Sequence, residues 1–177
     1  MRRHPMSCQP VDRRWHSTLS DGTRIVLRRL ESRDAGAVVD LYETLTDEEC
    51  YLRFFTPRPA DLKGWAISLV RESSDRYALG AFDGTVLLGV ANYIGCRKSG
   101  DAETAVVVAH NEHLRGVGTA LLRRLGQIAK DNGLHRLVAD VLAENHLMLQ
   151  MMSDSGLSCT RHLDGPIMHV VIDLDTA

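Results

Sequence analysis

Residues 106–120, VVVAHNEHLRGVGTA, are the most informative part of the chain. The three valines at 106–108 are typical of a strand that is buried on both faces of a sheet. After a short polar loop, Gly116 and Gly118 open a helix over residues 116–131 that has one apolar face. Glycines let backbone N–H groups approach an anion closely, and the helix N-terminus adds its partial positive charge. The stretch therefore predicts a loop that binds a phosphate or pyrophosphate group.

The glycine pattern is informative only in this context. A G-x-G pair alone recurs in many helical proteins as a turn or a helix cap. The loop lacks the Gly-Lys-Ser/Thr sequence that completes a P-loop, and it lacks the third glycine of the dinucleotide-binding GxGxxG motif. The buried strand before the glycines and the amphipathic helix after them are what favour phosphate binding.

Regular elements are predicted on both sides of this stretch. Apolar alternation or continuous apolar runs predict strands at residues 23–27, 77–81, 86–94, 102–109, 136–141 and 167–174. Apolar residues at helical spacing predict helices at residues 35–41, 46–54, 61–71, 116–131 and 145–155. Ser32 is expected to cap the first helix, and Thr46 with Glu49 forms a capping box for the second. Asp83 and Gly84 predict a type I′ turn. The order predicts one mixed α/β sheet rather than regular βαβ units.

Composition and charge narrow the class of protein. The 177 residues suit one domain, and 44% apolar with 25% charged residues exclude a disordered chain, a collagen and a disulfide-rich miniprotein. Lys and Arg total 21 against 23 Asp and Glu, so the net charge of −2 gives no general attraction to nucleic acid or an anionic membrane. No apolar run approaches the roughly 20 residues that span a bilayer. We expect a cytoplasmic protein with no nucleic-acid or membrane partner.

The N-terminal region and the cysteines give weaker signals. Residues 1–20 are basic but lack the apolar stretch of a secretory signal, so we expect a flexible tail before a domain over residues 21–177. The alternative is a small basic contact with an anionic ligand or partner. The cysteines, at positions 8, 50, 96 and 159, form no CxxC pair and are expected to be free thiols in a reducing compartment.

The glycine loop and its surroundings resemble the GCN5-related N-acetyltransferase (GNAT) family. The resemblance rests on RGVGTALL at residues 115–122, on the strand after that helix and on Ala143-Glu144-Asn145, and it covers about residues 23–174. The family pattern Q/R-x-x-G-x-G/A begins at His113, which departs from Gln or Arg, and Leu114 replaces a common glycine. The resemblance implies a GNAT fold, one mixed and mostly antiparallel sheet flanked by helices, and an acetyl-CoA-dependent enzyme.

A narrower resemblance is to the protein lysine acetyltransferase (Pat-like) branch of the family. It rests on Asp21-Gly22-Thr23 before a strand, on YLRFF at residues 51–55 and on a glutamate before the valine strand. Members of this branch often carry a regulatory module, for which 177 residues leave no room, so we expect the catalytic domain alone.

The GNAT resemblance also assigns cofactor-binding residues. Backbone groups of the strand are expected to hold the pantetheine arm of acetyl-CoA, at Val106, Val107 and Val108. The loop is expected to hold the pyrophosphate, through His113, Leu114, Arg115, Gly116, Val117, Gly118 and Thr119. Asn145 is expected near the thioester, and Arg115 is expected to provide local positive charge for the phosphates.

Glu103 is the candidate catalytic residue. A lysine with a pKa near 10.4 is protonated at neutral pH, so acetyl transfer needs a base that takes a proton directly or through water. From the residues alone, Glu103 is a surface glutamate at a sheet edge; the family resemblance makes it the general base. In a regular strand Glu103 and Ala105 share one face, although a bulge typical of the family would alter this alternation.

Three further positions complete the predicted site. Many family members have a proton-donating tyrosine where this chain has Met152, which cannot donate a proton and is expected to pack in the core. Water would then protonate the thiolate, whose pKa is near 8.5, and the Val106 N–H would hold the carbonyl oxygen.

Tyr51 and Arg53 either line the acceptor groove or support their helix. The histidines show no metal-ligand spacing, and no metal is expected.

The sequence therefore predicts an acetyl-CoA-dependent N-acetyltransferase whose acceptor is a protein lysine. The first alternative is an acetyltransferase for a small amine such as an amino acid, a polyamine or an antibiotic, which would favour an acidic acceptor pocket. The second is a non-catalytic acyl-CoA-binding module. A homodimer through an exposed C-terminal strand is a further family-like expectation.

Overall fold

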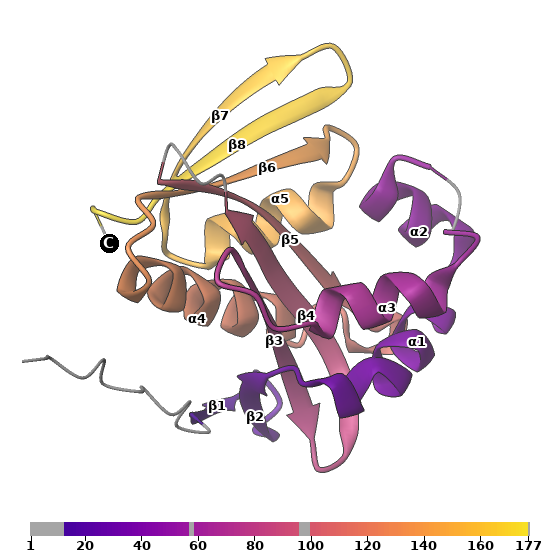
Figure 1. Cartoon of the computed structure of the whole chain (residues 1–177). Helices are drawn as coiled ribbons and strands as arrows, with labels where there is room; N and C mark the ends of the chain where they lie inside the picture. The colour runs from indigo at the N-terminus through magenta and orange to yellow at the C-terminus, as the bar shows by residue number, and fades with distance from the viewer. Residues whose placement is uncertain (1–12, 57–58, 96–99, 177) are drawn as a thin grey trace, which may run out of the picture.

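The computed structural model describes residues 13–56, 59–95 and 100–176. One eight-stranded sheet in the order β1-β2-β3-β4-β5-β6-β8-β7 runs through the molecule (Figure 1). Its strands are β1 (Arg14–Thr18), β2 (Arg24–Arg29), β3 (Arg76–Asp83), β4 (Val86–Gly95), β5 (Asp101–Val108), β6 (Arg136–Leu142), β7 (Ser158–Asp164) and β8 (Ile167–Asp173). All neighbours pair antiparallel except β5 and β6, which are parallel. The predicted mixed, mostly antiparallel sheet is confirmed.

Helices cover both faces of the sheet. They are α1 (Ala35–Glu43), α2 (Asp47–Phe54), α3 (Leu62–Val70), α4 (Val117–Asp131) and α5 (His146–Asp154), with the 3₁₀ turns η1 (Ser32–Asp34) and η2 (His110–Glu112). Leu121 and Leu125 of α4 pack with Met152 of α5 in one buried apolar cluster. Val38 and Leu41 of α1 belong to a second cluster. The sheet thus has a separate apolar core on each face. Met152 is buried, in agreement with its predicted packing role.

The predicted N-terminal tail needs one correction. Residues 14–18 form β1, which pairs with β2 so that Trp15 lies opposite Leu27. Trp15 packs against the core that includes α4, and the Arg124 guanidinium lies 5.1 Å from the centre of its ring. A strand with a single large apolar residue has too weak an alternation to be recognised from sequence. Residues 1–12 lie outside the described residues.

Two local predictions differ in detail, and one is confirmed. Ser32 does not cap α1, because it begins η1, whose capping box is formed by Glu31 and Asp34. Gly84 has a φ of 55° but Thr85 has no positive φ, as in a type II′ rather than a type I′ turn. The Thr46–Glu49 capping box of α2 is present as predicted.

The sheet opens between β5 and β6. β5 pairs with β4 from Ala102 to Val108 without any register shift, so the expected bulge is not found there. With β6, however, β5 pairs only from Asp101 to Glu103. Beyond this point the strands separate, and β6, β8 and β7 turn away together (Figure 1). Residues 104–108 therefore leave one edge of β5 unpaired by β6 in the middle of the sheet.

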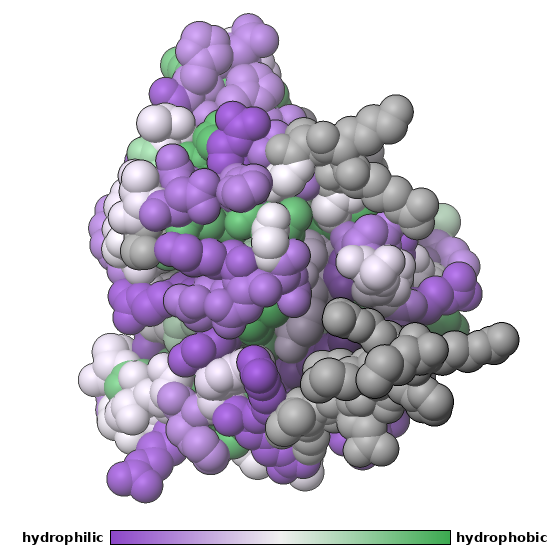
Figure 2. Space-filling model, turned by 60° about the vertical axis from the view of Figure 1, so that its left-hand side comes forward, coloured by the Kyte–Doolittle hydropathy of each residue, from purple (hydrophilic) through white to green (hydrophobic). Residues whose placement is uncertain are grey.

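The face of the molecule drawn in Figure 2 is mostly hydrophilic. On the face drawn in Figure 2, hydrophilic side chains cover most of the surface, and hydrophobic ones show only in small areas between them. Among the described residues, no helix has the length and apolar character needed to cross a membrane.

We expect Asp34→Asn to lower the free energy of unfolding by about 2 kcal/mol at pH 7. Asp34 accepts two hydrogen bonds from the Arg28 guanidinium, at 2.8 and 2.9 Å, and one from the Glu31 N–H at 2.8 Å. Both side chains of the ion pair are largely shielded from solvent, and Asn would remove the negative charge that faces Arg28. Urea unfolding at pH 7 measures the difference, with exposed Asp40→Asn on α1 as the control.

The same pair predicts a pH dependence. Burial raises the pKa of Asp34, but the hydrogen bonds from Arg28 and from the Glu31 N–H outweigh it and lower the pKa overall. A carboxyl group with a lowered folded-state pKa contributes stability above its unfolded pKa of about 3.9 and loses it as the pH falls. The difference between wild type and Asp34→Asn should therefore shrink below about pH 4. A constant difference down to pH 3 would contradict this account.

Candidate active site

A cleft of about 870 Å³ opens where β5 and β6 separate. Its walls come from α2, β5, η2, the start of α4, β6 and α5. This volume lies within the usual range of ligand clefts. The predicted site residues that line it are Arg53, Glu103, Val106, Val107, Val108, His113, Leu114, Gly116, Val117, Gly118, Thr119 and Asn145.

The β5 backbone presents hydrogen-bonding groups to the cleft at alternate residues. The Ala109 N–H donates to the Leu88 carbonyl at 2.8 Å, and the register continues unbroken along β5. Hydrogen-bonded and non-hydrogen-bonded pairs alternate in an antiparallel ladder, so Val107 bonds to β4. The N–H and C=O groups of Val106 and Val108 therefore point to the edge from which β6 has turned away. His113 Nε2 lies 3.1 Å from the Val108 carbonyl, so the other three groups remain for an extended ligand with amide groups, such as a pantetheine arm.

The two glycines of the loop have different structural reasons. Gly116, immediately before α4, has a φ of 92°, which strongly favours glycine. Gly118 has ordinary φ, but a Cβ there would lie 3.1 Å from Met151 Cγ and 3.3 Å from Val108 Cγ2. Leu114 also has a positive φ, 63°, at the position where the family often has glycine. The loop thus delivers the N-terminus of a 15-residue helix to the cleft, which suits a pyrophosphate.

The side chain of Arg115 does not line the cleft, contrary to its predicted role at the phosphates. Its guanidinium donates to Asp21 Oδ2 at 2.6 and 3.0 Å and to Thr23 Oγ1 at 3.0 Å, and it also contacts Glu112. Hydrogen bonds from the Thr23 N–H and hydroxyl, together with Arg115, lower the pKa of Asp21 to about 2. The Ser20 N–H and hydroxyl both donate to the Arg115 carbonyl. Arg115 therefore fastens the β1–β2 turn to the glycine loop.

Glu103 lies at the point where the sheet divides. It is the last residue of β5 that pairs with β6, opposite Val138, and its side chain is exposed on the cleft wall. Ala102 and Val106 belong to the core that includes α4, whereas Val107 belongs to the other core, so the strand alternates as predicted. Among the described residues, no hydrogen bond or ion pair engages the Glu103 carboxylate.

The remaining predicted residues differ in their placement. Asn145 lines the cleft, but its side-chain oxygen also accepts a hydrogen bond from the Met148 N–H at 3.1 Å and so caps α5. Arg53 lines the cleft with its guanidinium 5.0 Å from the centre of the Phe54 ring. Tyr51 is 46% exposed and does not line the cleft. The structure thus brings Arg53, but not Tyr51, to the candidate site.

Acidic side chains dominate the charged groups of the cleft. Among the described lining residues, Arg53 is the single arginine and there is no lysine. The carboxylates are those of Glu48, Glu49, Glu103, Glu112, Asp140 and Asp154. Such a surface is suited to a positively charged ligand, whereas the backbone N–H groups and the α4 dipole are suited to anionic groups.

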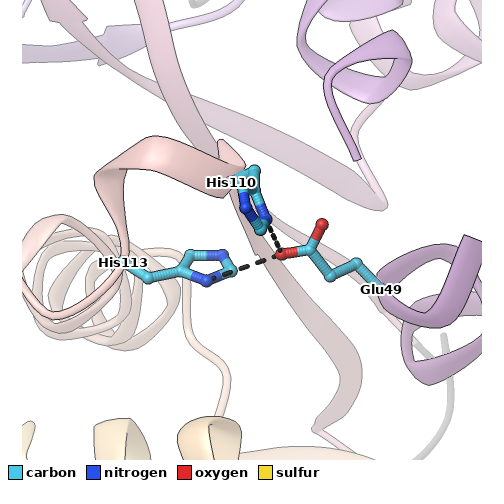
Figure 3. A group of neighbouring side chains, drawn as sticks. All are labelled: Glu49, His110 and His113. Carbon is cyan, nitrogen blue, oxygen red and sulfur yellow. Dashed lines mark hydrogen bonds and ion pairs between the residues drawn. The ribbon is translucent and has the colours of Figure 1, made fainter. Parts of the chain in front are cut away.

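One cluster in the cleft was missed by the sequence analysis. Glu49 Oε1 lies 2.9 Å from His110 Nδ1 and 3.5 Å from His113 Nδ1, and both imidazoles point to this oxygen (Figure 3). Burial raises the pKa of Glu49, but hydrogen bonds from Thr46 and His110 outweigh it and lower the pKa overall. The capping box is a sufficient explanation for Glu49 in the sequence, and no local signal connects it to His110, which is 61 residues away.

An open strand edge beside a glycine loop and a helix N-terminus defines an α/β protein that holds an extended, phosphate-bearing ligand across a split sheet. The model of the acetyltransferase (GNAT) domain family matches residues 24–158. The chain belongs to this family. It is 25% identical over 155 residues to Acetyltransferase PA5475 of Pseudomonas aeruginosa. The aligned region covers 85% of this chain and 83% of that protein.

Solved structures show the same fold. The GNAT domain of S. lividans PAT superposes with a TM-score of 0.81 and 26% identity over 90% of this chain and 96% of that chain. The yncA protein of Salmonella typhimurium, solved with its cofactor acetyl-CoA, superposes with a TM-score of 0.68 and 19% identity. The match covers 86% of this chain and 95% of that chain. A cAMP-binding acyltransferase from Mycobacterium smegmatis superposes with a TM-score of 0.64 and 21% identity. The match covers 93% of this chain and 49% of that chain. The chain is a GNAT acetyltransferase that uses acetyl-CoA.

Replacing Gly116 tests the loop. We expect Gly116→Ala to cost about 1–2 kcal/mol of stability, because an alanine is strained at a φ of 92°. The distorted loop should weaken acetyl-CoA binding about tenfold, equivalent to about 1.4 kcal/mol. Calorimetric titration measures the affinity. The control is Gly36→Ala, at an exposed helical position with open space, which should stabilise the protein by about 0.5–1 kcal/mol without changing the affinity. Unchanged affinity in folded Gly116→Ala would refute the loop's role.

Proposed function

We propose that this acetyltransferase acts on the ε-amine of a lysine in a protein, with Glu103 as the general base. The observation that carries the base assignment is the carboxylate of Glu103, exposed in the cleft at the point where β5 and β6 separate. A base must reach the acceptor nitrogen, and the split in the sheet is the place where an acceptor and the β5 edge can meet.

The chain's own groups would divide the chemistry as follows. Acetyl-CoA supplies an activated thioester carbonyl. Glu103 takes a proton from the acceptor ammonium, directly or through water, so that the neutral nitrogen can form the new C–N bond as the C–S bond breaks. The nitrogen then loses its second proton to water and becomes the neutral amide. The backbone N–H of Val106, which points to the cleft, would hold the carbonyl oxygen. Met152 is buried and cannot donate a proton, so water protonates the departing thiolate.

Two findings support a protein lysine as the acceptor. The YLRFF stretch at residues 51–55 gives the chain its resemblance to the Pat-like branch. The likeness to the GNAT domain of S. lividans PAT extends over nearly all of that domain. The acid-rich cleft suits the positive charge of a lysine, but it is also the feature expected for a small-amine acceptor and therefore does not separate the two candidates.

The same carboxylates would also attract a small cationic amine, which is the second candidate acceptor. For either acceptor we propose a cytoplasmic location, because the described cysteines, Cys50 and Cys159, are free thiols of the kind that a reducing compartment preserves. The C-terminal strand β8 lies inside the sheet between β6 and β7, contrary to the expectation of an exposed C-terminal strand, so a homodimer would form instead through the exposed edge strand β7.

Glu103→Gln tests the base. We expect kcat/KM to fall about 10²–10⁴-fold while the acetyl-CoA affinity stays within about twofold, because the amide keeps the shape but cannot take the proton. Release of CoA thiol measures the rate. Glu48→Gln, which removes another exposed carboxylate from the same cleft, is the control and should retain most activity. Full activity in Glu103→Gln would contradict the base assignment. If the wild type transfers acetyl groups and Glu103→Gln still binds acetyl-CoA but no longer transfers them, a purely acyl-CoA-binding module is excluded.

The acceptor class needs a separate comparison. CoA release should be measured with a panel of lysine-containing proteins and, in parallel, with a panel of amino acids, polyamines and aminoglycosides. We expect turnover with at least one protein, and mass spectrometry should place the acetyl group on a lysine side chain. Turnover confined to the small amines would refute the protein-lysine proposal and favour the second candidate.

A further inference from the structure

We infer that Glu49, His110 and His113 form a binding site for a divalent transition-metal ion of the Zn²⁺ type on the wall of the cleft. The inference goes beyond the proposed function, since neither acetyl transfer nor the Glu103 assignment requires it. It rests on the arrangement of the three side chains in Figure 3 and on the groups that hold them in place.

The three ligand atoms are already close to metal-binding geometry. One atom from each residue lies within 4.8 Å of the other two. With metal–ligand distances of roughly 2.0–2.1 Å, tetrahedral zinc places two ligand atoms about 3.3 Å apart. The observed distances from Glu49 Oε1, 2.9 Å to His110 Nδ1 and 3.5 Å to His113 Nδ1, lie on either side of this value. Small side-chain movements would therefore admit an ion.

The local structure explains why the two histidines converge. His110 begins the 3₁₀ turn η2, and His113 follows three residues later. Side chains at i and i+3 of a 3₁₀ turn lie on the same side, so both imidazoles face α2. There Glu49, in the first turn of α2, provides the carboxylate. The site thus joins two segments that are distant in sequence.

A second observation concerns the hydrogen bond of His113. Its Nε2 lies 3.1 Å from the Val108 carbonyl, which can only accept, so Nε2 carries the proton. In the neutral ring, Nδ1 then directs a lone pair at Glu49 Oε1, 3.5 Å away. A cation between these two atoms, either a metal ion or a proton on Nδ1, would make the contact attractive. A histidine that donates its second nitrogen to a backbone carbonyl is also the usual outer-shell arrangement at metal sites.

The carboxylate is oriented in the same way. Glu49 Oε2 accepts a hydrogen bond from the Thr46 N–H at 2.8 Å, which leaves Oε1 directed at the two histidines. The Glu49 side chain is 17% exposed, His113 29% and His110 53%, so the cluster is sheltered but open to an ion from solvent. The ligands are therefore held in position before any ion binds.

The donor set favours one class of ion. Two imidazoles with one carboxylate suit Zn²⁺ and neighbouring transition metals, whereas Mg²⁺ and Ca²⁺ prefer oxygen ligands. Three protein ligands leave a fourth coordination position for water or another ligand. The competing explanation is a proton on His113 Nδ1 in place of a metal, and this becomes one outcome of the test.

The test is direct metal binding by the full chain without an affinity tag. Protein stripped with a chelator is titrated with Zn²⁺ alone by calorimetry and with Co²⁺ by visible absorption, with Mg²⁺ as the negative comparison. We expect one Zn²⁺ per chain at the cluster, the intense visible bands of tetrahedral Co²⁺, a higher Tm with Zn²⁺ and no response to Mg²⁺. Acetyl-CoA and acceptor are absent, so failure here leaves the proposed function untouched.

Matched variants locate the ion. Glu49→Gln keeps an oxygen that accepts from the Thr46 N–H, so it preserves the capping box but removes the charged ligand. His110→Ala changes a half-exposed side chain and provides a second variant if the first is less stable. Each should weaken Zn²⁺ binding by at least the roughly 10–100-fold that loss of an outer-shell partner costs. His135→Ala is the control, since His135 pairs with Asp175 at 3.1 Å but belongs to no three-ligand cluster among the described residues.

The zinc titrations distinguish three outcomes. Binding that is weakened in Glu49→Gln and His110→Ala but unchanged in His135→Ala would establish the site. Absence of Zn²⁺ binding by the wild-type chain would overturn the inference. Equal binding by all variants would overturn it as well, because the ion would then lie elsewhere.

Discussion

The separation of β5 from β6 after Glu103 is the constraint on which the rest of the structure depends. β5 is paired with β4 along its length, and β6 is paired with β8 along its length, so neither strand can move to close the gap without losing a complete ladder. An unpaired strand edge inside a sheet leaves N–H and C=O groups that need partners. The Val108 carbonyl is engaged by His113, so the N–H and C=O of Val106 and the N–H of Val108 remain as a template for a ligand that can replace the missing strand. The cleft thus follows from strand pairing before any side chain is considered.

The loop beside this edge is held from two sides. Arg115 ties it to the β1–β2 turn through Asp21, and the contacts of His110 and His113 with Glu49 tie it to α2. These contacts restrain a segment that includes residues with positive φ, where strain must be balanced by the surroundings. A loop fixed in advance loses less conformational entropy when a ligand binds, so residues that never touch the ligand can still contribute to its affinity.

The sequence predicts what is encoded in periodicity and caps. The valine run at 106–108, the apolar face of the helix after Gly116 and the Thr46–Glu49 box each specify an element within a few residues, because each signal is local. The failures have tertiary causes. The Arg115 side chain could have faced the cleft or the β1–β2 turn, and only the fold places Asp21 beside it. Glu49 has a sufficient local explanation as a capping residue, which hides its contact with His110.

Charge explains how one cleft can serve two opposite ligands. The chain as a whole is nearly neutral, yet the lining is rich in carboxylates and has a single arginine among its described residues. Carboxylates repel a phosphate-bearing cofactor, so its phosphates must rely on directed backbone N–H groups and on the α4 dipole, which act only at short range and in one orientation. A cationic amine, by contrast, is attracted by the whole acidic wall. In the proposed function, the two ligands would therefore be selected by different interactions, the anion by backbone geometry and the cation by side-chain charge, and Glu103 lies where the two regions meet.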